Sequence, residues 1–449
     1  MKAKHVAIRS NAFDELVGEC PREHPADLLN GGRRRLLKAA GAGALGALTA
    51  PTLAFAKQNE GKPRGGDKHR ILMDGHVHVT SAAYWLGTDV WKPQPPHTGW
   101  NFAEAYAAGV NVIVENLSTY SYWNFNYTPK HMLRLIENFH EIAETHQDKM
   151  GVALTVADAR RIAKDGRMAV FLSVESGWDH EGDIDVLRAL YRLGLRGIQF
   201  ATQTGFNNLA DSGASTFWGG VSPNGKNVIA EANRLGVFLD ITHASPAAQS
   251  QIVELSRAPV VASHVTPGGF IAGGISDAVI QQLAAKGGVM GLHGGAASSG
   301  KRYRAWQAAN PATAAALGAP LTTLVNYRPS YVRNQDTDNY GAYIAQFDAD
   351  NRQHWADVFK PFVDDPVALT QIPTVDEWAE MVTYVSNLVG PDHVGIGLDM
   401  FGGRSHVIEP GGYQDLAGAI ERVTTPENAR KIEGENWLRV LDQIFAMAG

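Results

Sequence analysis

The sequence predicts a (β/α)8 barrel, a fold in which parallel strands alternate with helices and close into a ring. Eight short apolar runs of strand length follow one another along the 449-residue chain, and each ends on a polar side chain. The polar residues that end these runs are the pair His76 and His78, then Glu115, Glu175, Gln203, His243, His264, His293 and Asp399. Because the carboxyl ends of barrel strands face one mouth, we expect these side chains to gather there.

The first run extends from Ile71 to Val79 and places His76 and His78 two residues apart. Alternate residues of a strand face the same side, so both imidazoles can point into the barrel. The second strand is expected at about Val110–Glu115, followed by a helix at about Pro129–His146 with apolar residues at helical spacing. Three histidines of this helix have no partner at ligand spacing and are expected to be solvated: His131, His140 and His146.

The remaining six strands are expected near residues 168–176, 197–203, 236–243, 258–264, 287–293 and 393–399. Helices are expected between the third and fourth strands, at Asp183–Arg196, and between the fifth and sixth strands, after a cap at or near Ser245. About a hundred residues, from Gly294 to Pro391, separate the seventh and eighth strands, which is more than a βα unit needs. We predict a helical insertion there, at the active-site end, whose last helix is Thr374–Gly390.

The segment from Ser81 to Pro129 is dense in aromatic side chains. Loops after barrel strands surround the mouth, so these rings could form a wall or lid over a substrate. Packing of the loop onto the barrel explains the rings equally well, because large aromatic side chains mostly serve burial. Both interpretations stay open.

Residues 1–56 have the order of an export signal. Arg33 and Arg34 precede an Ala- and Gly-rich apolar run that ends in a small-x-small pattern at residues 54–56. This order resembles the twin-arginine export signal of bacteria, and the start of an ordinary basic helix is the alternative. We expect cleavage after Ala56, a disordered linker at 57–69 and one barrel domain at 70–449, in a soluble periplasmic protein without stable membrane insertion.

Charge and cysteine content limit the partners and the ligands. The formal charge is −6, and without residues 1–56 the chain would have 32 basic and 41 acidic residues, a charge of −9. That balance argues against a nucleic acid partner, which needs a basic footprint. The single cysteine, Cys20, lies in the predicted signal, so a metal ion in the mature chain must be held by imidazole and carboxylate groups.

Seven motifs occur in an order that points to a known family: DGH-x-H, VES, LRALYRLGLRGIQFATQTGFNNLADS, LDITHAS, VVASH, GPDHVGIGLD and GENWLRVL. They resemble the membrane (renal-type) dipeptidase family, peptidase family M19, of the amidohydrolase-like metal-dependent hydrolases. The resemblance extends from about Leu72 to Leu441, and it implies two divalent metal ions, with zinc expected from the ligand types.

The resemblance also assigns roles to individual residues. His76 and His78 would hold one ion, and Glu175 would bridge it to the other. His243 and His264 would hold that second ion. Asp399 matches a last-strand aspartate that takes a proton from the attacking water and returns it to the leaving amine.

Three positions depart from the family pattern. His78 stands where the family usually has aspartate, and imidazole can replace carboxylate as a zinc ligand. Gln203 stands where a histidine polarises the scissile carbonyl, and an amide can donate a hydrogen bond but carries no charge. The arginine that grips the free carboxylate of a dipeptide is missing near Gly273. His293 has no ligand counterpart, and we expect either a substrate contact or a hydrogen-bonded structural role.

These observations predict an exported dizinc hydrolase that cleaves an amide bond in a dipeptide-like or modified peptide substrate through a metal-bridging hydroxide. Other amidohydrolase-like enzymes that cleave lactones or phosphodiesters share most of the metal-binding pattern, and they remain the alternative. A metal-retaining binding protein with little turnover is a third interpretation. The resemblance also allows a homodimer, although no residue indicates an interface.

Overall fold

The computed structural model describes residues 70–93, 101–118, 128–175, 178–179, 181–201, 207–213, 216–315, 366–400 and 406–448. The predicted export signal and linker, Gln203 and residues 316–365 of the predicted insertion lie outside these ranges. Within them, no helix has the length and apolar character that crossing a bilayer requires.

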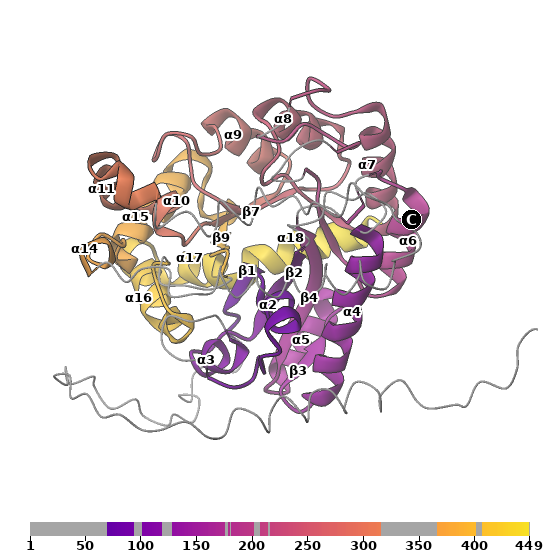
Figure 1. The fold of residues 1–449 in the computed structure, drawn as a ribbon, viewed down its shortest axis with the longest axis horizontal. Coiled ribbons are helices and arrows are strands. Elements are labelled where there is room, and N and C mark those ends of the chain that lie inside the picture. The colour runs from indigo at the N-terminus through magenta and orange to yellow at the C-terminus, as the bar shows by residue number, and fades with distance from the viewer. Residues whose placement is uncertain are drawn as a thin grey trace, which may run out of the picture. The chain divides into compact units, whose positions relative to one another are not determined.

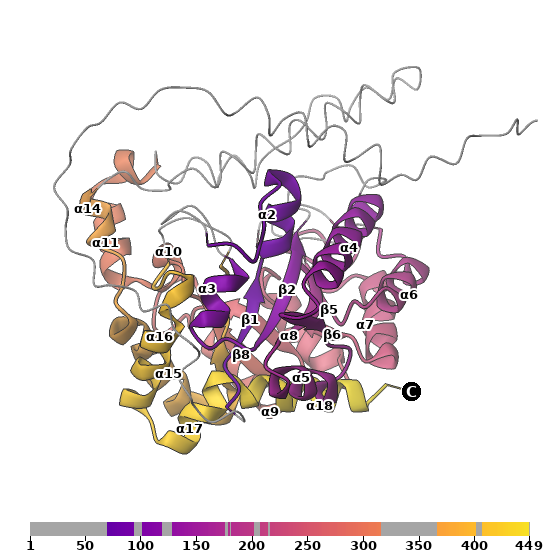
Figure 2. The ribbon, with the colours of Figure 1, turned by 90° about the horizontal axis from the view of Figure 1, so that it is seen from below.

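The strands that were predicted form parallel β-structure in the centre of the fold, surrounded by helices (Figures 1 and 2). Their bounds are β1 Met73–Val77, β2 Val112–Ser118, β4 Met168–Glu175, β5 Gly197–Gln199, β6 Phe238–Asp240, β7 Val261–Val265, β8 Val289–Leu292 and β9 Val394–Ile396. One further strand, β3 at Met150–Val152, pairs with the beginning of β4 and was not predicted.

Two seams join the strands into a barrel. Hydrogen bonding divides them into the sheets β1-β2-β4-β3 and β5-β6-β7-β8-β9. A parallel bridge between Leu172 and Leu195 connects β4 to the segment that leads into β5. A second bridge, between Val77 and Met400, connects β1 to the segment that follows β9. The predicted (β/α)8 architecture is therefore present.

The helices follow the strands in the order that a barrel requires. Their bounds are α2 Val79–Leu86, α3 Phe102–Ala107, α4 Thr128–Thr145, α5 Val156–Lys164, α6 Ile184–Arg192, α7 Pro223–Leu235, α8 Pro246–Leu255, α9 Asp277–Ala285, α10 Ala296–Ser299, α11 Lys301–Ala309, α14 Pro366–Leu369, α15 Val375–Val389, α16 Tyr413–Val423, α17 Pro426–Arg430 and α18 Asn436–Ala446. Ser245 caps α8 as predicted, because its side chain accepts a hydrogen bond from the Ala248 amide. The described part of the predicted insertion contains the helices α10, α11, α14 and α15.

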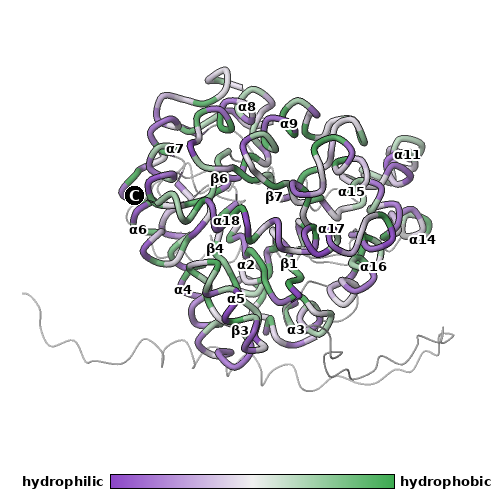
Figure 3. The backbone as a smooth tube through the Cα atoms, turned by 180° about the vertical axis from the view of Figure 1, so that it is seen from behind, coloured by the Kyte–Doolittle hydropathy of each residue, from purple (hydrophilic) through white to green (hydrophobic). Residues whose placement is uncertain are grey.

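Trp437 of α18 explains why two glycines, Gly75 and Gly395, occur in β1 and β9, the strands beside the bridge between Val77 and Met400. A Cβ atom on Gly75 would lie 2.1 Å from the Trp437 ring, and one on Gly395 would lie 2.4 Å from its Nε1. The same Nε1 donates a hydrogen bond to the Ile396 carbonyl at 2.9 Å. Hydrophobic segments gather in the strands, while the outer helices alternate in character (Figure 3). Trp437 thus fixes the spacing of β1 and β9, the strands that precede His78 and Asp399.

Two predictions about single residues were wrong. Strand β2 continues past Glu115 to Ser118, and the Glu115 carboxylate accepts hydrogen bonds from Thr80 N, Thr80 Oγ1 and Val79 N. Glu115 therefore caps the first turn of α2 and does not end a strand. His131 is buried rather than solvated, because it stacks on Trp85 with an angle of 4° between the rings.

Candidate metal centre

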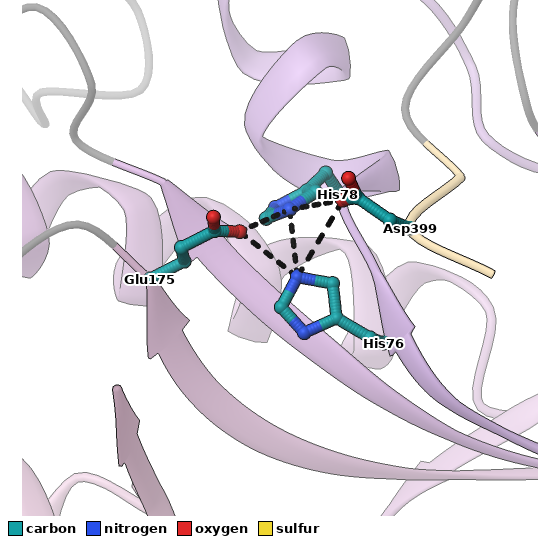
Figure 4. Close-up of side chains that lie close together, drawn as sticks. All are labelled: His76, His78, Glu175 and Asp399. Carbon is teal, nitrogen blue, oxygen red and sulfur yellow. Dashed lines mark hydrogen bonds and ion pairs between the residues drawn. The ribbon is translucent and has the colours of Figure 1, made fainter. Parts of the chain in front are cut away.

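Six of the predicted site residues meet at the carboxyl ends of the strands. His76 belongs to β1, Glu175 is the last residue of β4, and His264 belongs to β7. His78 follows β1 directly, and His243 and Asp399 lie three residues after the ends of β6 and β9. Figure 4 shows that the side chains of His76, His78, Glu175 and Asp399 point toward one another.

Glu175 lies between two groups of histidines. Its Oε2 is 2.9 Å from His76 Nε2 and 2.6 Å from His78 Nε2. Its Oε1 is 2.9 Å from His243 Nε2 and 3.8 Å from His264 Nε2. We call His76 and His78 the first group, and His243 and His264 the second group. One carboxylate therefore presents a different oxygen to each group.

The donor atoms fit divalent cations. Within each group the two Nε2 atoms are 3.0 Å apart. The Nδ1 of His78 is 2.6 Å from the Asn116 carbonyl, which can only accept, so Nδ1 carries the proton and Nε2 of the neutral ring is bare. A bare nitrogen so close to a carboxylate oxygen and another imidazole favours a cation between them.

The electrostatics of the site favour positive charge beside Glu175. Burial opposes ionisation of this carboxyl, but the surrounding histidines, His78 foremost, hold its pKa well below the usual range. Burial also opposes a charge on His78, yet Glu175 and Asp399 raise the pKa of that imidazole well above its usual value. Burial lowers the pKa of His264, which keeps this ring in the neutral form that binds metal.

Backbone strain occurs at two of these residues. Among the residues that the structure describes, His243 and Asp399 are the non-glycine residues with positive φ, at 65° and 59°. Such a conformation costs about 1–3 kcal/mol and persists where the surroundings enforce it. The carbonyl of Asp399 accepts a hydrogen bond from His406 Nε2 at 2.9 Å, and its amide donates to the His76 carbonyl at 3.1 Å. These contacts hold the turn that directs the Asp399 side chain inward.

His293 contacts Asp399. The Gly295 amide donates to His293 Nδ1 at 2.8 Å, so the neutral ring carries its proton on Nε2. That nitrogen is 3.4 Å from Asp399 Oδ2, whereas Asp399 Oδ1 is 3.3 Å from His78 Nε2. Burial opposes ionisation of Asp399, but neighbouring histidines, His264 foremost, hold its pKa well below the usual range. One oxygen of the Asp399 carboxylate therefore faces the first group, and the other oxygen faces His293.

A cation, the guanidinium of Arg304, lies near Gly273. Gly273 has φ of 88°, and a Cβ there would lie 3.9 Å from Arg304 Nη2. Arg304 Nη1 also donates to the Ala272 carbonyl at 2.6 Å. By contrast, Arg302 contacts Glu377 at 2.9 Å. Gln203 lies outside the described residues.

Sequence reasoning missed two polar residues behind the ligands. Ser263 precedes His264 in VVASH, and Asp240 precedes His243 by three residues in LDITH. Both are buried and lie within hydrogen-bond distance of each other. The sequence signal that could have found them is a polar residue within a predicted apolar strand.

The sequence matches the model of a known protein family. The sequence model of "Membrane dipeptidase (Peptidase family M19)" matches residues 68–448. Dipeptidase verJ of Clonostachys rogersoniana is 25% identical over 322 residues, which are 70% of this chain and 64% of that protein. Dipeptidase tcpJ of Claviceps purpurea is 25% identical over 70% of this chain and 60% of its own length. The match thus spans less than two thirds of these relatives.

Solved structures share the fold at low sequence identity. The probable dipeptidase PvdM from Pseudomonas aeruginosa has a TM-score of 0.64 at 21% identity, covering 85% of this chain and 97% of that chain. A metallo peptidase from Rhodobacter sphaeroides, liganded with a phosphinate mimic of the dipeptide L-Ala-D-Ala, has a TM-score of 0.60 at 15% identity, with coverage of 84% and 99%. These likenesses support the barrel architecture.

Proposed function

Because the chain belongs to the membrane dipeptidase family, peptidase family M19, we propose that it is a metal-dependent hydrolase that cleaves an amide bond in a peptide-like substrate. The position of Glu175 carries this proposal, since one buried carboxylate faces two histidine groups with different oxygens. A site that holds two cations around a shared anion has this arrangement.

We propose two divalent ions, of which zinc suits imidazole and carboxylate ligands. The first group would hold one ion, the second group the other, and Glu175 would contact both. When bound, the two ions supply an acidified water and polarise the scissile carbonyl. Aspartate or histidine at position 78 can serve such a site, and the histidine leaves it with one negative charge less.

Asp399 supplies the proton transfer in this proposal. Its ionised carboxylate can accept a proton from the attacking water at Oδ1, the oxygen that faces the first group. The same oxygen can return the proton to the leaving amine. His293 Nε2 faces the other oxygen and so limits rotation of the carboxylate. His293 therefore orients the acid–base group in this account.

We propose that the substrate is larger or less charged than a plain dipeptide. Gln203 would donate a hydrogen bond to the developing oxyanion without a charge, and Gly273 supplies no guanidinium for a free carboxylate. Among the described residues, Arg304 lies near Gly273 and could bind a substrate carboxylate there.

We also propose export through the twin-arginine pathway, on the strength of Arg33 and Arg34 and the apolar run that follows them. Replacing both arginines with lysine should block export and leave the uncleaved precursor in the cytoplasm. Cell fractionation and the mass of the protein measure this. Normal processing of the variant would contradict the proposal.

A substrate panel tests the proposed reaction class. Purified wild-type protein, with its metal content measured, is assayed on matched amide, ester, lactone and phosphodiester substrates. We expect turnover on amides to exceed turnover on the others. Preference for a lactone or phosphodiester would assign the alternative enzyme class, and two bound ions without turnover of any substrate would indicate a binding protein.

A further inference from the structure

We propose that the buried hydroxyl of Ser263 sets the tautomer of one histidine in each group, and thereby couples the two metal sites. The inference rests on the proposed assignment of the two groups to two ions. Ser263 lies in β7 and is 2% exposed. Its Oγ is 2.8 Å from His76 Nδ1 and 2.8 Å from His264 Nδ1.

The hydroxyl proton of Ser263 is donated to Asp240 and not to either histidine. A hydroxyl has one proton to donate and two lone pairs to accept with. The proton is donated to Asp240 Oδ2. Asp240 Oδ1 is already filled, because it accepts from Thr242 N at 3.0 Å, Thr242 Oγ1 at 2.7 Å and Ser263 N at 3.0 Å. Four donors around Asp240 suit a carboxylate, which only accepts.

The two lone pairs of Ser263 Oγ then accept from both histidines. His76 and His264 must each carry a proton on Nδ1, which leaves Nε2 of each neutral ring bare. His76 Nε2 faces Glu175 Oε2, and His264 Nε2 lies 3.0 Å from His243 Nε2. Nitrogens that can bind metal are therefore presented to both groups by a single oxygen.

This arrangement differs from the support of His78. The Asn116 carbonyl fixes the tautomer of His78 alone, so that contact serves one group. Ser263 serves both, across 187 residues of sequence from His76. Removing its hydroxyl leaves two ligands free to place a proton on Nε2, where it competes with a metal ion.

The test measures zinc affinity in place of turnover. Metal-free wild type and Ser263→Ala are titrated with Zn²⁺ against a chelator of known affinity, which yields two dissociation constants per chain. We expect both constants to rise about 10–100-fold in the variant, the usual effect of losing a group that orients a ligand. A rise in only one constant, or in neither, would overturn the coupling.

Ser173→Ala is the matched control. Ser173 is also a buried serine on a central strand, two residues before Glu175, and its Oγ has no hydrogen-bond partner among the described residues. We expect both constants to stay at wild-type values. Equal loss of affinity in Ser173→Ala and Ser263→Ala would show that any lost interior hydroxyl weakens the site, and would overturn the proposal.

Asp240→Asn tests the direction of the hydrogen bonds independently. The three donors at Oδ1 require the amide oxygen there, so the amide NH₂ faces Ser263 Oγ and donates to it. The Ser263 proton must then go to one histidine Nδ1, and that ring carries its own proton on Nε2. We expect a folded chain, checked by its thermal unfolding, that binds one zinc ion fewer than wild type. Full occupancy with unchanged affinities would overturn the proposed polarity.

The outcomes separate this inference from the proposed function. Wild type that binds two zinc ions but cleaves no amide refutes the function, and the affinities of the variants still decide the coupling. Wild type that binds fewer than two ions refutes the assignment on which the coupling rests.

Discussion

Glu115 and Glu175 are buried glutamates on the neighbouring strands β2 and β4, and they face opposite sides of the barrel wall. Both side chains are fully buried. Glu115 pairs in register with Val77, which lies between the inward-facing His76 and His78. Glu115 therefore faces outward, to the start of α2. Glu175 faces inward to four histidines. Burial raises the pKa of Glu115 to about 7, whereas the histidines hold that of Glu175 well below its usual value.

The difference shows that the face of a strand, rather than residue type or burial, decides what a carboxylate does. Outside the barrel the partners of a glutamate are backbone amides at the start of one helix. Inside it the partners come from three strand ends. Replacing the two residues in parallel tests this comparison directly.

Glu175→Gln should have the largest effect. An amide offers one oxygen and no charge, so it cannot serve both histidine groups. We expect loss of bound metal and of measurable activity, determined by elemental analysis and by assay on the best amide substrate. Glu115→Gln is the matched control and should keep both ions. Full metal content in Glu175→Gln would show that Glu175 is misassigned.

The second prediction concerns the mouth above Glu175. Losing the arginine that binds the substrate carboxylate weakens transition-state binding by about 1.5–3 kcal/mol. Losing a charged donor to the oxyanion weakens it by about 2.7–4 kcal/mol. Together these lower kcat/KM on free dipeptides by about three to five powers of ten, relative to a site with both groups. We expect wild type to cleave a dipeptide and its C-terminal amide at similar rates, and Gln203→His to gain activity on both.

Arg304 is the group that could reverse this result. Efficient cleavage of free dipeptides with rejection of their amides would mean that a cation grips the carboxylate. Arg304→Ala would then lose that preference if Arg304 is the anchor. Arg302→Ala is the control, because Arg302 already contacts Glu377. If neither variant changes the preference, neither Arg304 nor Arg302 is the anchor.

Asp399→Asn should affect turnover without affecting the ions. The amide cannot accept the proton of the attacking water, so kcat should fall about 10²–10⁴-fold, the usual contribution of general acid–base catalysis. Metal per chain should stay at the wild-type value. Loss of an ion would instead make Asp399 a ligand of the first group, which its 3.3 Å distance from His78 Nε2 allows.

The outward glutamate should affect stability in a pH-dependent way. The folded chain binds the Glu115 proton more tightly than the unfolded chain, because its pKa is raised from 4.5 to about 7. Its stabilising contribution is therefore complete below about pH 4.5 and is lost as the pH rises through about 7. Glutamine does not titrate. The free energy of unfolding is measured in urea for both proteins. The value for Glu115→Gln minus the value for wild type should rise by about 3 kcal/mol between pH 4.5 and pH 8. A pH-independent difference would contradict this.

The strand ends could be predicted because two simple rules act together. Alternation along a strand places His76 and His78 on one face, and the barrel brings the carboxyl ends of its strands to one mouth. The run that contains Glu115 shows the limit of these rules. Its apolar pattern continues through Leu117, so periodicity could not tell an interior residue from a terminal one.

Other features depend on contacts that the local sequence does not contain. Burial of His131 depends on Trp85, 46 positions earlier in the sequence. The Ser263 contacts join β7 to β1. The residues with positive φ, His243 and Asp399, are not glycines, and their backbones are held by distant residues: Gly213 contacts His243, and His76 contacts Asp399. Tertiary packing decides each of these.

The central claim is that one carboxylate serves two metal ions. A crystal structure of zinc-loaded wild type, with anomalous data at the zinc edge, tests it most directly. The account predicts two zinc peaks on opposite sides of Glu175, one beside His76 and His78 and the other beside His243 and His264. A single peak, or a second one that Glu175 does not contact, would contradict it.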